Sequence, residues 1–562
     1  MGAWAGMALP DLSGVMAGVT VVALPPRRLM ATYYDTADLR LARWGVTLRH
    51  RTAMTEEGSS GGPDASGGPV ASGGPDEAAW TLKLPTDDAV PEGGLARHEL
   101  GFNGGPGRVP AAAVQMVRAF SRSAPLGPVA RLRTDRLRLE LRDADGSALA
   151  ELDDDEVSVL VSGPTGRGRR LAARFREIEI ELASGADPAV LAATVARLRS
   201  AGAGAPDPTP KVVRALGPRA LAAPDVTVVA AGRHSSAGEA VRAAIGGSVV
   251  RLIRHDPGAR LGDDPEDVHQ ARVATRRLRS DLRTLRPLLD DEWAAGLREE
   301  LGWLADLLGG VRDTDVLLER VQRHAGHLPA ADAKGVDRLL RQLKDERDVA
   351  RQALIAGMDS ARYTELLDRL VAAAAGPVFA LPEAADPPPA VGDPSAAEAP
   401  AVGDPPAVEV GAGAATRILI GPGPEATPAI DLLPALVRRP WRHLAQAVAA
   451  LGPQPADDAL HDIRIRAKRC RYAAEVAVAV VGKPAARLGV AVAEVQSVLG
   501  DFHDAIVAEE WLRAAAAGGP ANVGLAAGQL IAIERGEAAA SRARWTKAWA
   551  AASSKKLRTW LD

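Results

Sequence analysis

The sequence predicts two domains of different fold class, an α+β domain built on antiparallel strands followed by an all-α domain. Up to about residue 182, short segments of alternating apolar and polar residues are separated by turn residues. After the turn-rich GAGAPDPTPK at 202–211, nearly every segment has the period of a helix. A length of 562 residues also exceeds what one core usually serves. We place the strand domain at 8–216, a linker at 217–234 and the helical domain at 235–562.

We predict strands where apolar and polar residues alternate, and helices where apolar residues recur with a period of 3.6 residues. The segments read as strands are VTVVA, MATYYD, GVTLRHR, AWTLKL, LARHEL, ARLRTDRLRLEL, SALAELD, EVSVLV and ARFREIEIEL. Helices are predicted over 110–122 and 188–201. A Gly/Ser/Pro repeat at 58–77 predicts a flexible loop between two strands. Repeated DPPPAVGDP-type units predict a disordered insert over 381–430.

Composition favours a soluble cytoplasmic protein. Cys470 is the single cysteine, so the chain forms no internal disulfide. The start MGAWAGMALPDLSG lacks the features of a secretion signal, and no run of about 18 apolar residues could span a membrane. Aromatic residues are only 3% of the chain, which counts against single-stranded nucleic acid as the ligand.

Most predicted strands have one apolar and one charged side. In FREIEIEL, at 175–182, three glutamates alternate with Ile178, Ile180 and Leu182. A solvated strand face is the simplest interpretation, but the same pattern recurs in other strands. If these strands close into a barrel with helices over the apolar side, the charges point inward. Guanidinium groups bind phosphate bidentately and carboxylates hold Mg²⁺ or Mn²⁺, so a polyanion held with a divalent metal suits such an interior.

These segments resemble a CYTH domain, the triphosphate tunnel metalloenzyme fold. The resemblance rests on ATYYDTADLRLARWGVTLRHR with AWTLKLP, RHEL, RLRTDR, AELDDDEV, REIEIEL and the lysine of PTPK. It implies an eight-stranded antiparallel tunnel that binds triphosphate. Family members hydrolyse inorganic triphosphate or thiamine triphosphate, and a few make cyclic AMP, so the implied substrate is a triphosphate or a nucleotide.

The resemblance also assigns residues. The phosphate-binding set would be Arg49, Arg51, Lys83, Arg133, Arg136 and Lys211. Glu177 and Glu179 would hold Mg²⁺ or Mn²⁺, with Glu99 and Asp153 nearby as catalytic groups that bind metal or position water.

One part of the CYTH pattern is missing. The family opens with a Glu-x-Glu-x-Lys strand, but here MGAWAGM runs directly into ALPDLSGV. We expect that a start codon placed too far downstream explains the missing strand; loss of the strand is the alternative. The chain as written should show little triphosphatase activity with Mg²⁺ or Mn²⁺, because half of the metal site is missing. It is an enzyme, a hydrolase of phosphoanhydrides, only if that strand exists.

The helical domain contains one motif twice. VHQARVATRRLRS at 268–280 and LHDIRIRAKRCRY at 460–472 both place a histidine ahead of regularly spaced basic residues. At about 100° per residue, each set falls within roughly 80° of one helix face. We call His269, Arg272, Arg276 and Arg279 the first stripe, and His461, Arg464, Lys468 and Arg471 the second stripe. Asp264, and Asp457 or Asp458, are predicted to cap the two helices.

A second repeat follows each stripe. LGGVRDTDV at 308–316 aligns with LGDFHDAIV at 499–507, which matches Asp313 to Asp504 and Arg312 to His503. Two related halves should therefore face each other across a pseudo-twofold axis, with the stripes forming one positive surface. A solvated basic face is the alternative, but few acidic residues interleave with the stripes.

This doubled motif resembles a CHAD domain, the conserved-histidine α-helical domain. The resemblance implies two four-helix bundles and a basic surface that binds inorganic polyphosphate. A phosphate contact for the histidines is favoured over a structural role, and metal ligation is the least favoured because cations surround them. The remaining alternatives are a nucleic-acid-binding protein, which the few aromatics disfavour, and a scaffold without chemistry. The sequence gives neither the oligomeric state nor the preferred substrate.

Overall fold

The computed structural model describes residues 1–4, 6–54, 79–86, 97–162, 169–380, 423 and 425–561. The predicted loop at 58–77 lies outside these residues, as do 381–422 and 424 of the predicted insert. Residues 423 and 425–430 of that insert are among the described residues: the Gly238 N–H donates to the Glu425 carbonyl at 2.9 Å, and a helix begins at Ala429. The insert prediction therefore extended too far toward the C-terminus.

The chain forms two compact units. One contains Met1–Thr227 with the helical segments Leu252–Val268 and Ile355–Val371. The other contains Val228–Arg251, His269–Leu354 and Ala372–Asp562. No helix in the described ranges is both long enough and apolar enough to cross a membrane.

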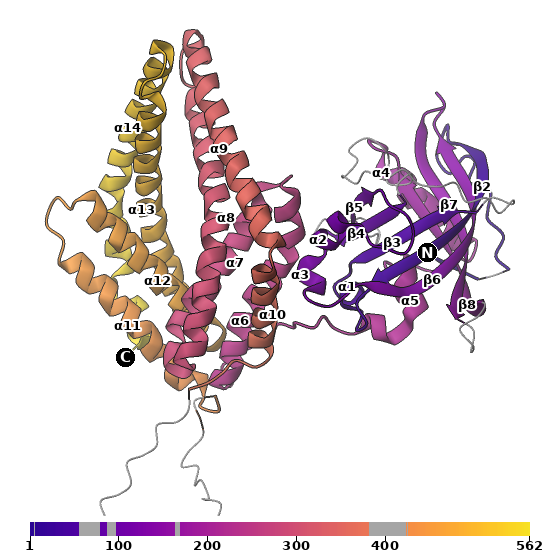
Figure 1. Ribbon diagram of the computed structural model, residues 1–562, viewed down its shortest axis with the longest axis horizontal. Helices are drawn as coiled ribbons and strands as arrows, with labels where there is room; N and C mark the ends of the chain where they lie inside the picture. Colours follow the sequence, from indigo (N-terminus) through magenta and orange to yellow (C-terminus); the bar gives the residue numbers. More distant parts are fainter. Residues whose placement is uncertain are drawn as a thin grey trace, which may run out of the picture. The chain divides into compact units, whose positions relative to one another are not determined.

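Residues up to Leu182 build an eight-stranded antiparallel sheet among the described residues (Figure 1). Its order is β1-β8-β7-β6-β2-β3-β4-β5. The strands are β1 (Gly2–Ala3), β2 (Thr20–Asp35), β3 (Thr47–Ala53), β4 (Trp80–Pro85), β5 (Arg97–Phe102), β6 (Gly127–Arg142), β7 (Ala148–Ser162) and β8 (Arg169–Leu182). The predicted antiparallel fold is confirmed. VTVVA and MATYYD merge into β2, and SALAELD and EVSVLV merge into β7.

The expectation that no strand precedes β2 is wrong. Gly2 and Ala3 pair with Glu177 and Arg176 of β8, because their extended backbone supplies hydrogen-bond partners for the N–H and C=O groups at the edge of that strand. This two-residue β1 carries neither a carboxylate nor a lysine. Any metal ligands of the sheet therefore come from the other strands.

Helices cover apolar parts of both sides of the sheet. On one side, which we call the outer face, Leu141, Leu152 and Ile178 pack with α4 (Pro188–Ser200). On the opposite side, the inner face, one apolar group packs with α5 (Lys211–Leu216). The predicted helix at 110–122 consists of two short helices, α2 (Ala111–Met116) and α3 (Arg118–Ser121), and α1 is Arg40–Arg43.

The described chain from Ala237 onward is helical, as predicted. Its α-helices are α6 (Ala237–Leu261), α7 (Pro265–Thr284), α8 (Asp291–Ala325), α9 (Ala333–Asp359), α10 (Ala361–Ala375), α11 (Ala429–Ala449), α12 (Asp457–Val481), α13 (Lys483–Ala516) and α14 (Ala521–Ala552). Asp264 caps α7 by accepting from the Glu266 N–H at 2.8 Å. At α12 the cap position is Ala456, so Asp457 and Asp458 lie in the first turn instead.

Four long helices, two from each half of the helical region, share one core. Leu317 and Val321 of α8 and Leu339 of α9 pack with Leu512 of α13 and Leu530 of α14. Figure 1 shows α8 with α9 and α13 with α14 as two long helix pairs. The helices that carry the doubled motif, α7 and α12, each lead into the first helix of one pair.

Candidate functional site

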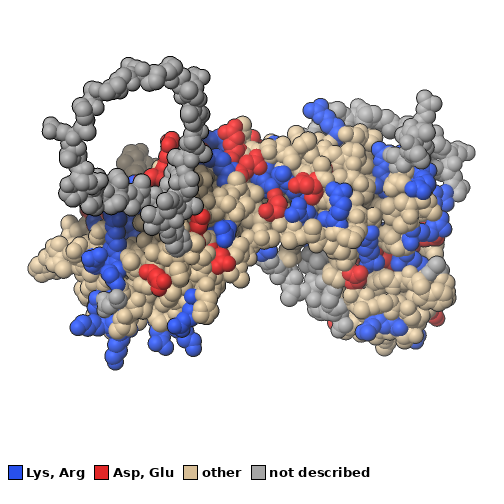
Figure 2. Space-filling model, turned by 90° about the horizontal axis from the view of Figure 1, so that it is seen from below, with Lys and Arg blue, Asp and Glu red and all other residues tan. Residues whose placement is uncertain are grey.

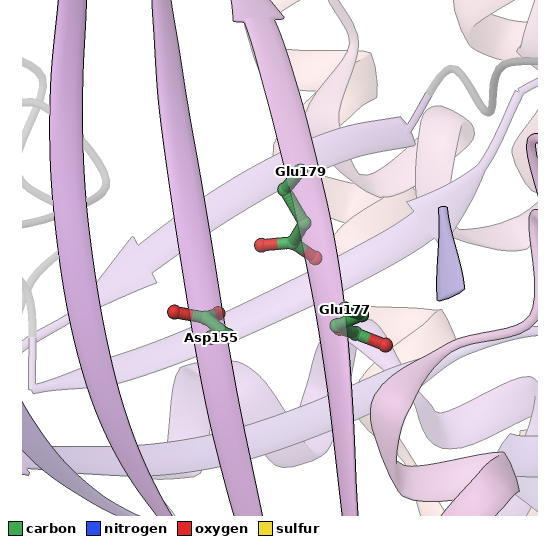
Figure 3. Close-up of side chains that lie close together, drawn as sticks. All are labelled: Asp155, Glu177 and Glu179. Carbon is green, nitrogen blue, oxygen red and sulfur yellow. The ribbon is translucent and has the colours of Figure 1, made fainter. Parts of the chain in front are cut away.

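Three carboxylates from two neighbouring strands meet on the inner face of the sheet (Figure 3). Asp155 of β7 lies opposite Glu177 of β8 in the register, and Glu179 follows two residues later on the same face. One ligand oxygen from each of the three lies within 4.8 Å of the others. Their apolar neighbour Ile178 points to the outer face and packs with α4 residues, which fixes the direction of both glutamates.

The ammonium group of Lys211 lies on these three carboxylates. Its Nζ is 2.6 Å from Asp155, 3.1 Å from Glu177 and 2.8 Å from Glu179. Burial opposes the charge of Lys211, but the carboxylates outweigh it and raise the lysine pKa. The Glu179 side chain is 52% accessible to water, yet the cations around it determine the direction of its pKa shift. Although burial works in the other direction, Lys211, then Arg136 and Lys83, lower the Glu179 pKa to about 2.

Arg136 lies on β6, the strand that pairs with β7 on the side away from β8, and it also contacts these carboxylates. Its guanidinium contacts Asp155 at 2.7 Å, forms an ion pair with Asp153 and lies 3.4 Å from Glu179. Burial raises the pKa of Asp153 to about 7; Arg136 opposes the rise and the neighbouring carboxylates, Asp155 first, add to it. Asp153 therefore changes its protonation state near neutral pH.

Lys83 shows that the sheet is rolled. It lies on β4, the seventh strand in the order, whereas Glu179 lies on β8, the second strand. The two side chains are nevertheless close enough to shift each other's pKa. Lys83 also pairs with Glu99 of β5, and burial together with Arg49 lowers its pKa. The inner faces of β4 and β8 thus face each other across an interior with charges of both signs.

Arg133 does not lie with the other proposed phosphate-binding residues. It is three positions from Arg136 on β6, and side chains on a strand alternate, so the two arginines point to opposite faces. Arg133 lies on the outer face, 3.7 Å from Asp135. Assigning both arginines to one site was incorrect for this reason. Arg49 and Arg51, two residues apart on β3, share the inner face.

Asp155 was missed by sequence reasoning, which selected Asp153 from the same AELDDDEV segment. The sequence did contain a signal for Asp155. Successive side chains of a strand point to opposite faces, so Glu151, Asp153 and Asp155 must share one face. The register then places Asp153 opposite Glu179 and Asp155 opposite Glu177. Asp155 is fully buried, at 0% side-chain exposure, and contacts both Lys211 and Arg136.

These residues fit a divalent cation. Mg²⁺ and Mn²⁺ prefer carboxylate oxygens, and Asp155, Glu177 and Glu179 supply three at close range. The ammonium of Lys211 shows that the position between them favours positive charge. A metal held there would compete with Lys211 for the same three carboxylates.

In the helical region, each stripe contacts the aspartate of its downstream repeat. Arg272 lies 2.8 Å from Asp313, and the equivalent Arg464 lies 3.7 Å from Asp504. Glycines of the repeats lie beneath both arginines: a Cβ at 309 would be 3.9 Å from Arg272 Nη2, and one at 500 would be 3.7 Å from Arg464 Nε. The acidic partners thus come from the next helix, which the stripes alone did not indicate.

Four cations of the two stripes lie close together. Burial, followed by repulsion from Arg464, Arg276 and Arg272, lowers the pKa of Lys468 to about 7. Burial and the same repulsion also lower the pKa of Arg464, against the attraction of Asp504. Arg276 reaches across from α7 to donate to the Tyr472 hydroxyl of α12 at 3.2 Å. The expected apposition of the two stripes is thus seen at these four side chains.

The remaining stripe residues lie in other surroundings. Arg471 is 3.5 Å from Glu475 and stacks on Tyr472. Arg279 lies near Arg283 and Arg298. Burial and then repulsion from Arg279 lower the pKa of Arg298, whereas for Arg283 burial, Arg469 and Arg298 come before Arg279. The first-stripe histidine, His269, lies in the second turn of α7 and is partly buried.

The two histidines of the second half form a pair. His461 Nδ1 lies 3.2 Å from His503 Nδ1. Burial and the nearby Arg464 lower both pKa values, that of His503 to about 4. Both rings are therefore neutral at pH 7, and the hydrogen bond between them needs one nitrogen as donor and the other as acceptor.

Charge is mixed on the molecular surface. On the face drawn in Figure 2, Lys and Arg side chains gather in several groups with acidic side chains among them. The formal net charge of −3 therefore describes no particular region of the protein.

Comparison with known proteins identifies both parts of the chain. The CYTH domain model matches residues 9–209 and the CHAD domain model matches 243–513. The uncharacterized protein Rv2226 of Mycobacterium tuberculosis strain H37Rv is 31% identical over 521 residues, 90% of this chain and 85% of that protein. The uncharacterized protein MT2285 of strain CDC 1551 matches with the same identity and coverage.

A search of solved structures also finds two matches. PptA from Streptomyces chartreusis is 22% identical with a TM-score of 0.42, covering 56% of this chain and 100% of that one. The CHAD domain from the plant Ricinus communis is 23% identical with a TM-score of 0.41, covering 58% of this chain and 96% of that one.

A rolled antiparallel sheet with a charged interior, followed by a duplicated helical region, defines a tunnel domain joined to a helical domain. The chain belongs to the family of proteins that combine a CYTH domain with a CHAD domain.

Proposed function

We propose that the CHAD domain binds inorganic polyphosphate along the two stripes, and that the CYTH domain binds triphosphate together with a divalent metal. The observation that carries the first part is the group of Arg272, Arg276, Arg464 and Lys468. Burial, followed by repulsion from the three arginines, brings the pKa of Lys468 to about 7. Asp313 and Asp504 lie beside these four cations and contribute two negative charges. The group therefore keeps an excess of positive charge, which favours the binding of an additional anion.

Polyphosphate suits this surface chemically. It carries about one charge per phosphate along a flexible chain, and guanidinium groups bind such oxygens bidentately. The stripes run along two helices from different halves, so a flexible chain can contact both without base recognition. The neutral pair of His461 and His503 at the end of the second stripe can still offer one N–H donor to a phosphate oxygen.

In the CYTH domain, the metal would be Mg²⁺ or Mn²⁺, held by Asp155, Glu177 and Glu179. When bound, such a metal neutralises and polarises phosphate oxygens. Arg136 of β6, Lys83 of β4 and Lys211 of α5 supply positive charge around these carboxylates. Because β1 adds neither a carboxylate nor a lysine, we expect this chain to bind triphosphate but to hydrolyse it slowly or not at all.

Competition between polyanions tests the first part of the proposal. Long-chain polyphosphate should displace labelled double-stranded DNA from the protein at a much lower phosphate concentration than DNA needs to displace polyphosphate. Fluorescence anisotropy at one fixed salt concentration measures both directions. If DNA displaces polyphosphate more readily, the helical domain is a nucleic-acid-binding domain instead.

Polyphosphate binding should take up a proton near pH 8. Lys468, with a pKa of about 7 in the ligand-free protein, is mostly neutral at that pH, and a bound polyanion favours its charged form. Affinity should therefore fall as pH rises from 7 to 9. Calorimetry in two buffers of different ionisation enthalpy measures the uptake. Lys468→Arg keeps the charge but does not titrate, so it should bind with less proton uptake; equal uptake would contradict the assignment.

Adding a carboxylate to β1 should strengthen metal binding. Position 2 lies directly opposite Glu177, so its side chain shares the inner face, and a Cβ there has only Arg214 within 4 Å. We expect Gly2→Glu to tighten Mn²⁺ binding by about tenfold, or about 1.4 kcal/mol, in a titration of the triphosphate-free protein. Leu137→Glu adds the same charge at a 57% exposed position on the outer face and serves as the control. Equal tightening in both variants would mean a general charge effect.

A further inference from the structure

The helical region also has a basic cavity that none of the stripe residues lines. It has a volume of about 290 Å³ and lies between the C-terminal end of α7 and helices α11 and α12. We call it the α11 pocket. Its lining residues are Ser280, Arg283, Thr284, Arg286, Pro287, Ala435, Leu436, Arg439, Pro440, His443, Arg466 and Arg469.

The α11 pocket has more positive charge than its own carboxylates balance. Arg286 pairs with Asp291 and Arg466 with Asp462, at 2.8 and 2.7 Å. Within the described part of the chain, no carboxylate lies at ion-pair distance from Arg283, Arg439 or Arg469. Burial, followed by repulsion from Arg469 and two other arginines, lowers the pKa of Arg283. A multiply charged anion would relieve this repulsion.

The rest of the lining differs from a site for a simple inorganic anion. Pro287, Ala435, Leu436 and Pro440 give the pocket an apolar wall. Pro440 lies inside α11 and has no N–H, so the Leu436 carbonyl lacks the hydrogen bond that a regular helix would give it. Inorganic polyphosphate offers neither an apolar surface nor, when fully ionised, a donor for that carbonyl. A ring with an amino or hydroxyl group offers both.

We propose that the α11 pocket binds a small organic phosphate, a nucleoside di- or triphosphate or an ester of similar shape, as a site separate from the polyphosphate surface. The arginines hold the phosphates, the apolar wall holds the ring, and the Leu436 carbonyl accepts from a polar group on it. The cavity volume of about 290 Å³ lies just below the usual range of small-molecule sites, about 300–1,000 Å³, so only a small ligand suits it.

Under the proposal above, the CYTH domain also binds triphosphates such as ATP, so the test uses a chemical probe placed in the α11 pocket itself. Ser280→Cys places a thiol in the lining, whereas Cys470 is fully buried and burial raises its pKa to about 12, so it reacts slowly. In the full-length protein, ATP should slow modification of position 280 by a thiol reagent at least tenfold, and inorganic triphosphate at equal concentration should protect far less. Adding Arg439→Ala and Arg469→Ala should remove most of the protection by ATP.

Three outcomes would overturn the proposal. They are no protection by ATP, equal protection by triphosphate and ATP, and stronger protection by polyphosphate than by ATP at equal phosphate concentration. Thr284→Cys probes the same cavity if Ser280→Cys fails to fold or to react. Protection by ATP should persist when Arg272 and Arg464 are both changed to glutamate. A failure of polyphosphate binding is therefore distinguishable from a failure of this proposal.

Discussion

Reversing the charge of Arg272 and Arg464 together should weaken polyphosphate binding by about 10² to 10⁴-fold. These arginines occupy equivalent positions in the two halves, and each contributes to the repulsion that lowers the pKa of Lys468. A hydrogen bond to a charged group contributes about 1.5–3 kcal/mol, and two are lost in the Arg272→Glu, Arg464→Glu variant. Both side chains are only partly buried, at 21% and 16% exposure, so the helices should still form. Anisotropy measures affinity and circular dichroism checks the fold.

The structure offers a matched control with the opposite expected sign. Asp313→Asn and Asp504→Asn remove the two carboxylates that contact these arginines, with almost no change of side-chain volume. This pair should bind polyphosphate more tightly than the wild-type protein, because the arginines lose their competing partners. If the reversal of both arginines leaves affinity unchanged, the helical domain is a scaffold and the stripes are a solvated surface.

Replacing Lys211 by methionine should make the stability of the CYTH domain depend on divalent metal. The lysine ammonium is the cation shared by Asp155, Glu177 and Glu179, and its side chain is 10% exposed. Breaking a buried ion pair from one side costs about 3–5 kcal/mol, and we expect the lower end because Glu179 is half exposed. In a chelator, the melting temperature of the domain should fall by about 5–10 °C. Mn²⁺ or Mg²⁺ should restore most of it.

The wild-type protein and an exposed lysine provide the comparison. Lys547→Met removes the same charge from an exposed position of α14 and should change the melting temperature little. The stabilisation by Mn²⁺ should be several degrees larger for Lys211→Met than for the wild type, because the metal no longer has to displace an ammonium group. Equal stabilisation of the two would show that metal and lysine do not share the carboxylates.

Alternation of residue types predicted the strands of the CYTH domain, since the side-chain period of a strand is a local property. The faces of Glu177 and Glu179 followed from it, and Asp155 was also within reach of the same argument. Arg133 was assigned to the site through resemblance alone, against its alternation with Arg136. The proximity of Lys83 to Glu179 required the rolled sheet, because these strands are not neighbours.

In the CHAD domain, the duplication was visible in the sequence because each motif occupies one helix and repeats residue by residue. Stripe geometry follows from the helix period, which needs no knowledge of neighbours. The contacts of Arg272 with Asp313 and of Arg464 with Asp504 needed the packing of separate helices. The same is true of the α11 pocket, whose lining comes from three segments far apart in the chain.

The amino-acid sequence by itself determined the succession of strands and helices, the charged side of most strands and the two basic stripes, because each depends on residues close together along the chain. Only the tertiary structure decided which charges meet. The three carboxylates around Lys211 and the cations around Lys468 belong to different elements, and their pKa shifts arise from burial and from charges brought together by folding.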